Sequence, residues 1–262
     1  MSTLTIAAVQ HDIQWLDQTA NFSQLEQQVE NYFKENDAVD LLLLSETFST
    51  GFCVNNKEVQ EPEDGGSTLI WLKKIAQQYN CVVAGSVLVS QSDKKVNRFY
   101  WVFADGTVEH YDKRHLFRLG NEQNYVEQGC ERKIITINGI KILPLVCYDL
   151  RFPVWSRNRQ DYDLMINVAN WPAARRHIWD TLLKARAMEN QAYVVGVNRI
   201  GNDGNGIAHS GGTVIIDFCG ELITAAPDNQ EQIISTTLDF GKLKKFKNDF
   251  PAFLDADNFE LT

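Results

Sequence analysis

The feature that most constrains the fold is a series of short apolar runs, rich in valine, isoleucine and leucine, that recurs along the whole 262-residue chain. Continuous apolar runs of this length are typical of strands buried on both faces of a sheet. We expect such strands at 4–10, 40–46, 81–89, 98–104, 140–149, 163–170, 192–199 and 213–218. Residues 86–108 indicate paired antiparallel strands with a turn at 91–94.

Amphipathic helices are expected between these runs, because apolar residues repeat at spacings of three and four. Such stripes occupy residues 25–33, 69–76 and 175–190. Helices that alternate with strands predict an α/β layered sandwich with mixed sheets. The glycine-rich segment 201–212 matches no phosphate-loop pattern, so we expect a hairpin or a long surface loop there. The chain has no linker or repeat, which favours a single domain over 1–262.

The charge balance and the cysteines restrict the partners and the compartment. With 25 basic and 34 acidic side chains the net charge is −9, which argues against nucleic acid or an anionic membrane as partner. The longest apolar run, 99–104, is far shorter than the ~20 residues needed to span a bilayer. Five cysteines without metal-type spacing favour reduced thiols, no metal site and a cytoplasmic protein.

Three strand ends carry side chains suited to chemistry, and functional groups collect at the carboxyl ends of strands in open α/β sheets. LLLLSETFSTGF delivers Glu46, HYDKRHLFRLGNE presents Lys113 followed by Glu122, and ILPLVCYDLRFP ends in Cys147 before a helix expected to begin at Pro153. Each residue alone is ordinarily a buried cysteine, a solvated carboxylate or a surface charge. Together they supply a nucleophile, a base and a cation for an oxyanion.

Three alternatives stay open for these residues. A Cys-His hydrolase would use His115 as its base. A binding protein would retain the fold without catalysis. A redox-active thiol protein would pair Cys147 with Cys53 or Cys219 in space, although no CxxC motif is present.

At the three strand ends the sequence resembles the nitrilase superfamily of carbon–nitrogen hydrolases. SETFSTGF is similar to the family's glutamate motif, YDKRHLF to its lysine motif and VCYDLRFP to its cysteine motif. The resemblance covers nearly the whole chain, from TIAAVQ to HSGGTVIIDFCGE, with the motifs in the family's order and spacing. It implies a four-layer α-β-β-α sandwich, commonly a homodimer, as one hydrolase domain over 1–262. It also implies hydrolysis of an amide, less often a nitrile, with release of ammonia and without metal or organic cofactor.

The resemblance also implies the roles of the site residues. Cys147 is the nucleophile that forms a thioester, Glu46 is the base and Lys113 stabilises the oxyanion. Glu122 matches a further glutamate that follows the lysine in several members, and Glu127 is the near alternative. The backbone N–H of Tyr148, which follows the nucleophile, is the expected second oxyanion donor.

Within the superfamily the motifs are most similar to bacterial omega-amidases. This implies a small-molecule substrate, 2-oxoglutaramate or 2-oxosuccinamate, and water as the second reactant. A broader short-chain aliphatic amidase or nitrilase is the runner-up. Trp171 and Phe52 are expected to wall the pocket, with ordinary core positions as the alternative.

An anionic substrate tail needs a cation, and the arginine fork suits a carboxylate. Arg151, four residues after Cys147, is our first candidate, with Arg175 and Arg176 as alternatives. The opposing interpretation places Arg151 in a structural ion pair with Asp149 or Glu189.

Overall fold

Two mixed β-sheets of six strands each form the centre of the molecule in the computed structural model, which describes residues 2–56, 60–91 and 94–260. The first sheet contains β1 (Thr3–Gln10), β2 (Leu41–Leu43), β3 (Val82–Gln91), β4 (Lys94–Val102), β5 (Val108–Asp112) and β14 (Gln232–Asp239). The second contains β6 (Ile135–Ile137), β7 (Ile140–Val146), β8 (Leu164–Ala169), β9 (Tyr193–Asn198), β12 (Val214–Ile216) and β13 (Leu222–Ala225). The strand orders are β14–β1–β2–β3–β4–β5 and β13–β12–β9–β8–β7–β6.

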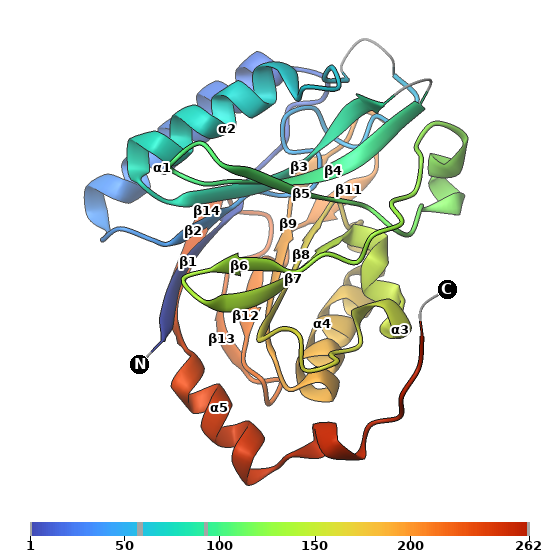
Figure 1. Cartoon of the computed structure of the whole chain (residues 1–262). Coiled ribbons are helices and arrows are strands. Elements are labelled where there is room, and N and C mark those ends of the chain that lie inside the picture. Colours follow the sequence, from blue (N-terminus) through green and yellow to red (C-terminus); the bar gives the residue numbers. More distant parts are fainter. Residues whose placement is uncertain (1, 57–59, 92–93, 261–262) are drawn as a thin grey trace.

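Helices cover the outer face of each sheet (Figure 1). The helices are α1 (Gln18–Glu35), α2 (Gly66–Tyr79), α3 (Pro153–Ser156), α4 (Arg176–Asn190) and α5 (Phe240–Asp249). Short 3₁₀ turns occur at Arg118–Gly120, Glu122–Asn124, Cys147–Arg151, Ala173–Arg175 and Ala252–Asp255. Helices α1 and α2 lie on the first sheet, and α4 lies on the second.

The alternation of side chains along β1 accounts for the layering. Leu4, Ile6 and Ala8 are fully buried in the core shared with the second sheet, whereas Ala7 and Val9 pack with α1 and α2. Successive residues of a strand point to opposite faces, so both faces of this strand are buried and its sequence is an uninterrupted apolar run. The expected four-layer α-β-β-α sandwich with mixed sheets is confirmed.

Both sheets combine parallel and antiparallel pairs. In the first sheet β1, β2 and β3 are parallel, and in the second β7, β8 and β9 are parallel. The other neighbours in the two sheets pair antiparallel. Parallel neighbours end at the same edge of a sheet, so the segments after β2, β7 and β8 are available to build one site.

Several expected strands are longer than the real ones, including 213–218, which forms β12 only over Val214–Ile216. Two others overrun next to the site. The run 40–46 forms β2 only as far as Leu43, and 140–149 leaves the sheet after Val146. The second correction has a backbone cause, because Cys147 has φ +47° and begins a 3₁₀ turn, which no strand accommodates. The third expected helix begins at Arg176, one residue later than predicted.

Other segments follow the expectation or were missed. Residues 86–108 do form antiparallel β3 and β4, although Ser92 and Asp93 of the expected turn lie outside the described residues. The glycine-rich segment forms a hairpin of β10 (Ile200–Asn202) and β11 (Ala208–Ser210). Strands β6, β13 and β14 and helix α5 were not predicted.

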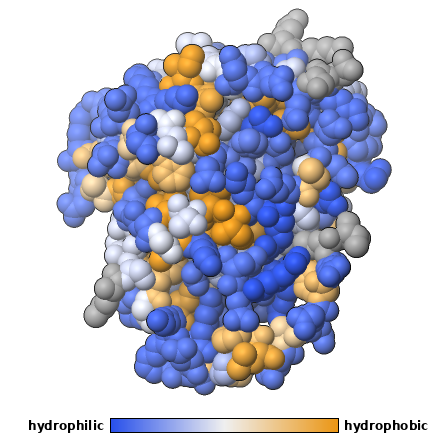
Figure 2. All heavy atoms as spheres, in the orientation of Figure 1, coloured by the Kyte–Doolittle hydropathy of each residue, from blue (hydrophilic) through white to orange (hydrophobic). Residues whose placement is uncertain are grey.

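The surface carries mostly hydrophilic side chains on the face seen in Figure 2, with small apolar groups near its middle and lower edge. In the described part of the chain, no helix is both long and apolar enough to cross a membrane. The five cysteines are free thiols.

Candidate active site

The carboxylate of Glu46 lies three residues beyond β2 and is fully buried. Its Oε1 accepts hydrogen bonds from Lys113 Nζ at 3.0 Å and from Asn97 Nδ2 at 2.8 Å. Its Oε2 accepts one from the backbone N–H of Asn170 at 2.8 Å. These three donors fix the orientation of the carboxylate and engage both of its oxygens as acceptors. Glu46 is therefore placed to receive a proton from a neighbouring group.

The ammonium of Lys113 lies between two carboxylates. Its Nζ is 3.0 Å from Glu46 Oε1 and 3.0 Å from each oxygen of Glu122. Burial by itself would lower the pKa of Lys113, but the charges of Glu122 and Glu46 outweigh it and raise this pKa above its usual value. Burial raises the pKa of Glu122, and the charge of Lys113 opposes that rise. Lys113 is thus a fixed positive charge beside the base.

The thiol of Cys147 is presented by the 3₁₀ turn at the end of β7. A residue other than glycine with positive φ is uncommon, and such strain concentrates at functional sites. Asp149 holds the turn, since its carboxylate accepts from the backbone N–H of Val146 at 3.0 Å and from the Tyr111 hydroxyl at 2.8 Å. The amide groups of a first helical turn have no partner within the helix, which leaves the N–H of Tyr148 available to a substrate oxygen.

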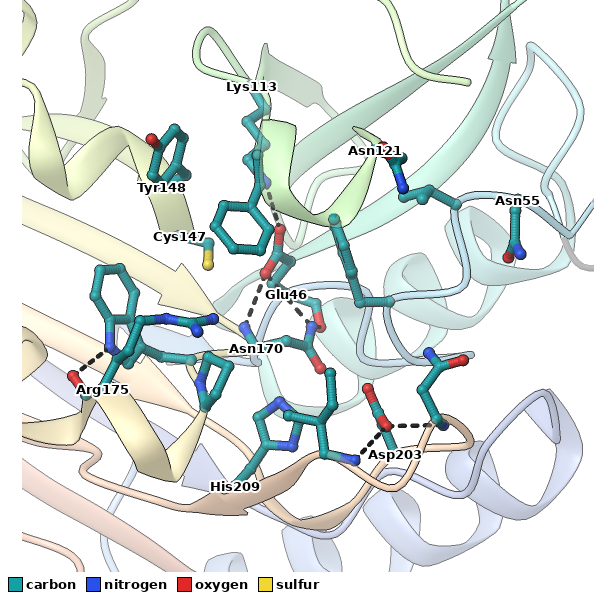
Figure 3. A pocket seen from close by; sticks show the side chains of 18 of the residues that line it. Glu46, Asn55, Lys113, Asn121, Cys147, Tyr148, Asn170, Arg175, Asp203 and His209 are labelled. Atoms are coloured by element: carbon teal, nitrogen blue, oxygen red, sulfur yellow. Dashed lines mark hydrogen bonds and ion pairs between the residues drawn. The ribbon is translucent and has the colours of Figure 1, made fainter. Parts of the chain in front are cut away.

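The resting thiol of Cys147 carries its proton. The side chain opens partly into the pocket, yet the dense protein around it makes burial the main cause that raises its pKa, followed by the negative charge of Glu46. Lys113 acts in the opposite direction but does not reverse the shift. A nucleophile of this kind needs a base that removes the proton during attack. Figure 3 shows Glu46 beside both Cys147 and Lys113.

His115 is engaged away from the thiol. Its Nδ1 and its backbone N–H both lie 2.8 Å from Asp149 Oδ1, and its ring stacks on Phe152 at 3.7 Å between centroids. It is not among the residues that line the pocket at Cys147. His115 therefore helps to hold the turn in place. Its position does not favour the Cys-His alternative.

A pocket of about 260 Å³ opens in front of the three groups. Its lining also includes five residues that were predicted to form it, namely Phe52, Tyr148, Arg151, Trp171 and Arg175. Glu122 lies behind Lys113, fully buried, whereas Glu127 is exposed. Glu122 is therefore the glutamate that contacts the lysine.

Two arginines of the pocket wall have no carboxylate partner among the described residues. The guanidinium of Arg151 lies 5.5 Å over the Trp171 ring, and that of Arg175 lies 5.3 Å over the Phe117 ring. Within the described residues the N–H groups of both guanidinium groups make no hydrogen bond, so they are available to an anion, as a carboxylate-binding site requires.

The other interpretations of these arginines do not match the contacts. The ion pair proposed for Arg151 is absent from the described residues, because Asp149 bonds to Tyr111 and His115. Glu189 pairs with Arg186 instead. Arg176 pairs with Asp180 and Asp228 and does not line the pocket.

Sequence reasoning missed the two asparagines that hold Glu46. Asn97 lies inside β4, where asparagine is unfavourable, and that misfit was the available signal. Asn170 follows β8, at a strand end equivalent to that of Cys147. Its Nδ2 also donates to Thr47 Oγ1 at 2.9 Å, which ties the second sheet to the segment after β2.

A metal centre has no support in the ranges 2–56, 60–91 and 94–260. No group of three or more histidine, cysteine, aspartate or glutamate side chains is arranged there to hold an ion. The described groups around Cys147 supply a nucleophile, a proton acceptor and a fixed cation, which suffice for acyl transfer from an amide.

Comparisons with known proteins agree with this chemistry. A model of the carbon–nitrogen hydrolase family matches residues 5–248. Omega-amidase YafV of Yersinia enterocolitica is 45% identical over 261 residues, with 100% of both chains covered. The 2-oxoglutaramate amidase of Bacillus subtilis is 33% identical over 255 residues, with 96% of each chain covered.

A solved structure is similar over the full length. XC1258 from Xanthomonas campestris, described as a CN-hydrolase superfamily protein with an arsenic adduct in the active site, superposes with a TM-score of 0.95. The two sequences are 39% identical, and the alignment covers 100% of both chains.

Proposed function

The chain belongs to the carbon–nitrogen hydrolase family, and from this premise we propose that it is an omega-amidase. Its substrate is 2-oxoglutaramate or the shorter 2-oxosuccinamate, whose terminal amide it converts to a carboxylate and ammonia. The observation that carries the proposal is the convergence of Glu46, Lys113 and Cys147 on a pocket whose wall holds two arginines that have no carboxylate partner in the described part of the chain.

Acylation begins at the thiol. Cys147 Sγ attacks the amide carbonyl carbon while Glu46 takes the thiol proton, and the carbonyl π electrons move to the oxygen. Lys113 Nζ and the backbone N–H of Tyr148 stabilise that oxyanion. Glu46 then passes the proton to the departing nitrogen, ammonia leaves, and a thioester remains on Cys147. General-base assistance of this type contributes ~10²–10⁴-fold.

Deacylation reuses the same base. Glu46 takes a proton from water, the resulting hydroxide attacks the thioester carbon, and the tetrahedral intermediate collapses with loss of the thiolate. The proton on Glu46 returns to Cys147, which restores the resting thiol. Glu122 keeps Lys113 in position through both steps, because each of its oxygens contacts Nζ.

A panel of short amides monitored by ammonia release tests the function. We expect 2-oxoglutaramate and 2-oxosuccinamate to be preferred over glutamine, nitriles and neutral aliphatic amides by tenfold or more, since a neutral tail leaves a charged donor without its partner. Equal kcat/KM for 2-oxoglutaramate and pentanamide would contradict the omega-amidase proposal in favour of a broader amidase.

Arg151 holds the substrate carboxylate in this proposal. Arg151→Met should raise KM for 2-oxoglutaramate by ~10–100-fold, the effect of losing a hydrogen bond to a charged group, and should change KM for pentanamide little. Steady-state kinetics on both substrates measure the difference. Arg118→Met is the matched control, because Arg118 is exposed near the pocket but does not line it. If Arg175→Met raises KM for 2-oxoglutaramate selectively and Arg151→Met does not, Arg175 is the arginine that binds the carboxylate.

We also propose a homodimer of single-domain subunits, each spanning 1–262, in the cytoplasm. Exposed apolar side chains support the dimer, namely Val154 on α3, Met188 on α4, and Phe250 and Leu254 after α5. The acidic net charge and the free cysteines are consistent with the compartment.

A further inference from the structure

The β10–β11 hairpin forms one wall of the active-site pocket, and the mechanism above uses none of its side chains. The hairpin residues that line the pocket are Asp203, Asn205, Ile207 and His209. His209 is the buried one, with 4% of its surface exposed, and Figure 3 shows its ring pointing from the hairpin into the pocket beneath Asn170.

The imidazole of His209 has unused hydrogen-bonding capacity. Its Nδ1 is buried and makes no well-formed hydrogen bond within the described residues, although the backbone of Gly201 and Ile207 lies against the ring. No hydrogen bond joins Nε2 to any residue of the described part of the chain. Buried polar groups are normally paired, and an unpaired one in a native structure calls for an explanation. Because Nδ1 has no accessible surface, Nε2 is the nitrogen that a ligand atom in the pocket can reach.

The ring is held rigidly, because a buried arginine anchors the hairpin. The Arg199 guanidinium donates to the carbonyl oxygens of Ile200 at 2.9 Å and Asn202 at 3.3 Å, and to that of Ile13 in the segment after β1 at 3.1 Å. The Asp203 carboxylate closes the hairpin turn by accepting from the backbone N–H of Ile207 at 2.9 Å. A group preorganised in this way loses little freedom when it binds a ligand.

The charge state of His209 limits what it can recognise. Burial, followed by the nearby Arg199 charge, lowers the pKa of His209 to about 4, so the ring is neutral at pH 7. A neutral imidazole has no net charge to attract a carboxylate, but it has one N–H that can donate to a carbonyl oxygen. The arginines and His209 therefore suit different parts of one substrate.

We propose that His209 is a specificity-determining residue that donates a hydrogen bond to the 2-oxo oxygen of the substrate. The proposal rests on the omega-amidase function. The amide carbon lies at Cys147, the carboxylate binds the arginine side of the pocket, and the oxygen beside that carboxylate meets the hairpin wall. His209 thus distinguishes 2-oxo acid amides from amides that lack the oxygen.

Two substrates that differ only in this oxygen test the proposal, namely 2-oxoglutaramate and glutaramate. The unmutated enzyme should prefer 2-oxoglutaramate by roughly three- to tenfold in kcat/KM, the contribution of one neutral hydrogen bond. His209→Phe keeps a flat ring of similar size but has no N–H, so it should bring the ratio close to one, mainly through KM for 2-oxoglutaramate. His209→Gln, which retains a donor, should restore part of the preference.

Ala208→Ser is the matched control, because Ala208 is exposed on the same strand and does not line the pocket. Inhibition by the products, 2-oxoglutarate against glutarate, gives an equilibrium measure of the same contact. A thermal melt checks each variant, and if His209→Phe does not fold, His209→Leu and the product inhibition of His209→Gln decide the question.

The outcomes separate this inference from the function on which it rests. If 2-oxoglutaramate stays preferred over glutaramate by the same ratio in His209→Phe, the inference is wrong and the omega-amidase function stands. Equal rates on both substrates in the unmutated enzyme also overturn the inference alone. No hydrolysis of 2-oxoglutaramate at all overturns both.

Discussion

Cys147→Ala is expected to abolish amide hydrolysis while the fold stays intact. Alanine has no atom that can form the thioester, so turnover should fall by ~10⁴-fold or more. The side chain opens partly into the pocket, so loss of the sulfur leaves no sealed cavity and should change the free energy of unfolding by less than about 1 kcal/mol. Ammonia release and a thermal melt measure the two effects.

Mass spectrometry of the unmutated protein with substrate separates the alternatives for this thiol. A thioester adduct on Cys147 supports the hydrolase, a reversible disulfide supports a redox protein, and no adduct supports a binding protein. His115→Ala should retain most activity, since Asp149 keeps its hydrogen bonds from Tyr111 and Val146. An inactive His115→Ala together with an active Glu46→Gln would favour the Cys-His mechanism.

Lys113→Met should damage both activity and stability. Activity should fall by ~10²–10³-fold or more through loss of the oxyanion donor. Removal of one partner from a buried ion pair costs about 3–5 kcal/mol, and here two buried carboxylates lose the cation that they share. Without the ammonium, burial and the Glu46 charge still raise the pKa of Glu122 and no lysine charge opposes them, so the free energy of unfolding of the variant should fall as pH rises through that raised pKa.

Ammonia release and chemical denaturation at several pH values measure these effects. Lys73→Met is the matched control, because Lys73 lies on the exposed face of α2 and should change neither quantity. If Lys113→Met keeps normal stability and full turnover at pH 7, the ammonium contributes to neither the base nor the oxyanion.

The placement of Glu46, Lys113 and Cys147 at one site follows from local sequence signals. Glu46 and Cys147 come after apolar strands, Lys113 comes after the more polar β5, and the strand ends of a layered α/β fold lie at a common edge. The expected strands overran at both Glu46 and Cys147, because hydrophobicity continues where the backbone has already turned. Local patterns therefore located the residues better than they located the ends of the strands.

The remaining site residues depend on contacts that no local pattern encodes. Asn170 contacts Glu46 from 124 positions away, and Asn97 reaches it from the interior of another strand. His209 lies in a segment whose composition predicted only a hairpin or loop. Arg151 and Arg175 were named from their charge and their position after strand ends, and the absence of carboxylate partners in the described residues emerged only from the packing.

The base and the nucleophile come from opposite sheets. Glu46 follows β2 of the first sheet and Cys147 follows β7 of the second, and the apolar side chains between the sheets set their separation. The volume of that core therefore helps to set the distance between Glu46 and Cys147 in the active site. A substitution that adds or removes a methyl group between the sheets should therefore change the rate of amide hydrolysis as well as the free energy of unfolding. Catalysis thus constrains core residues that never touch the substrate.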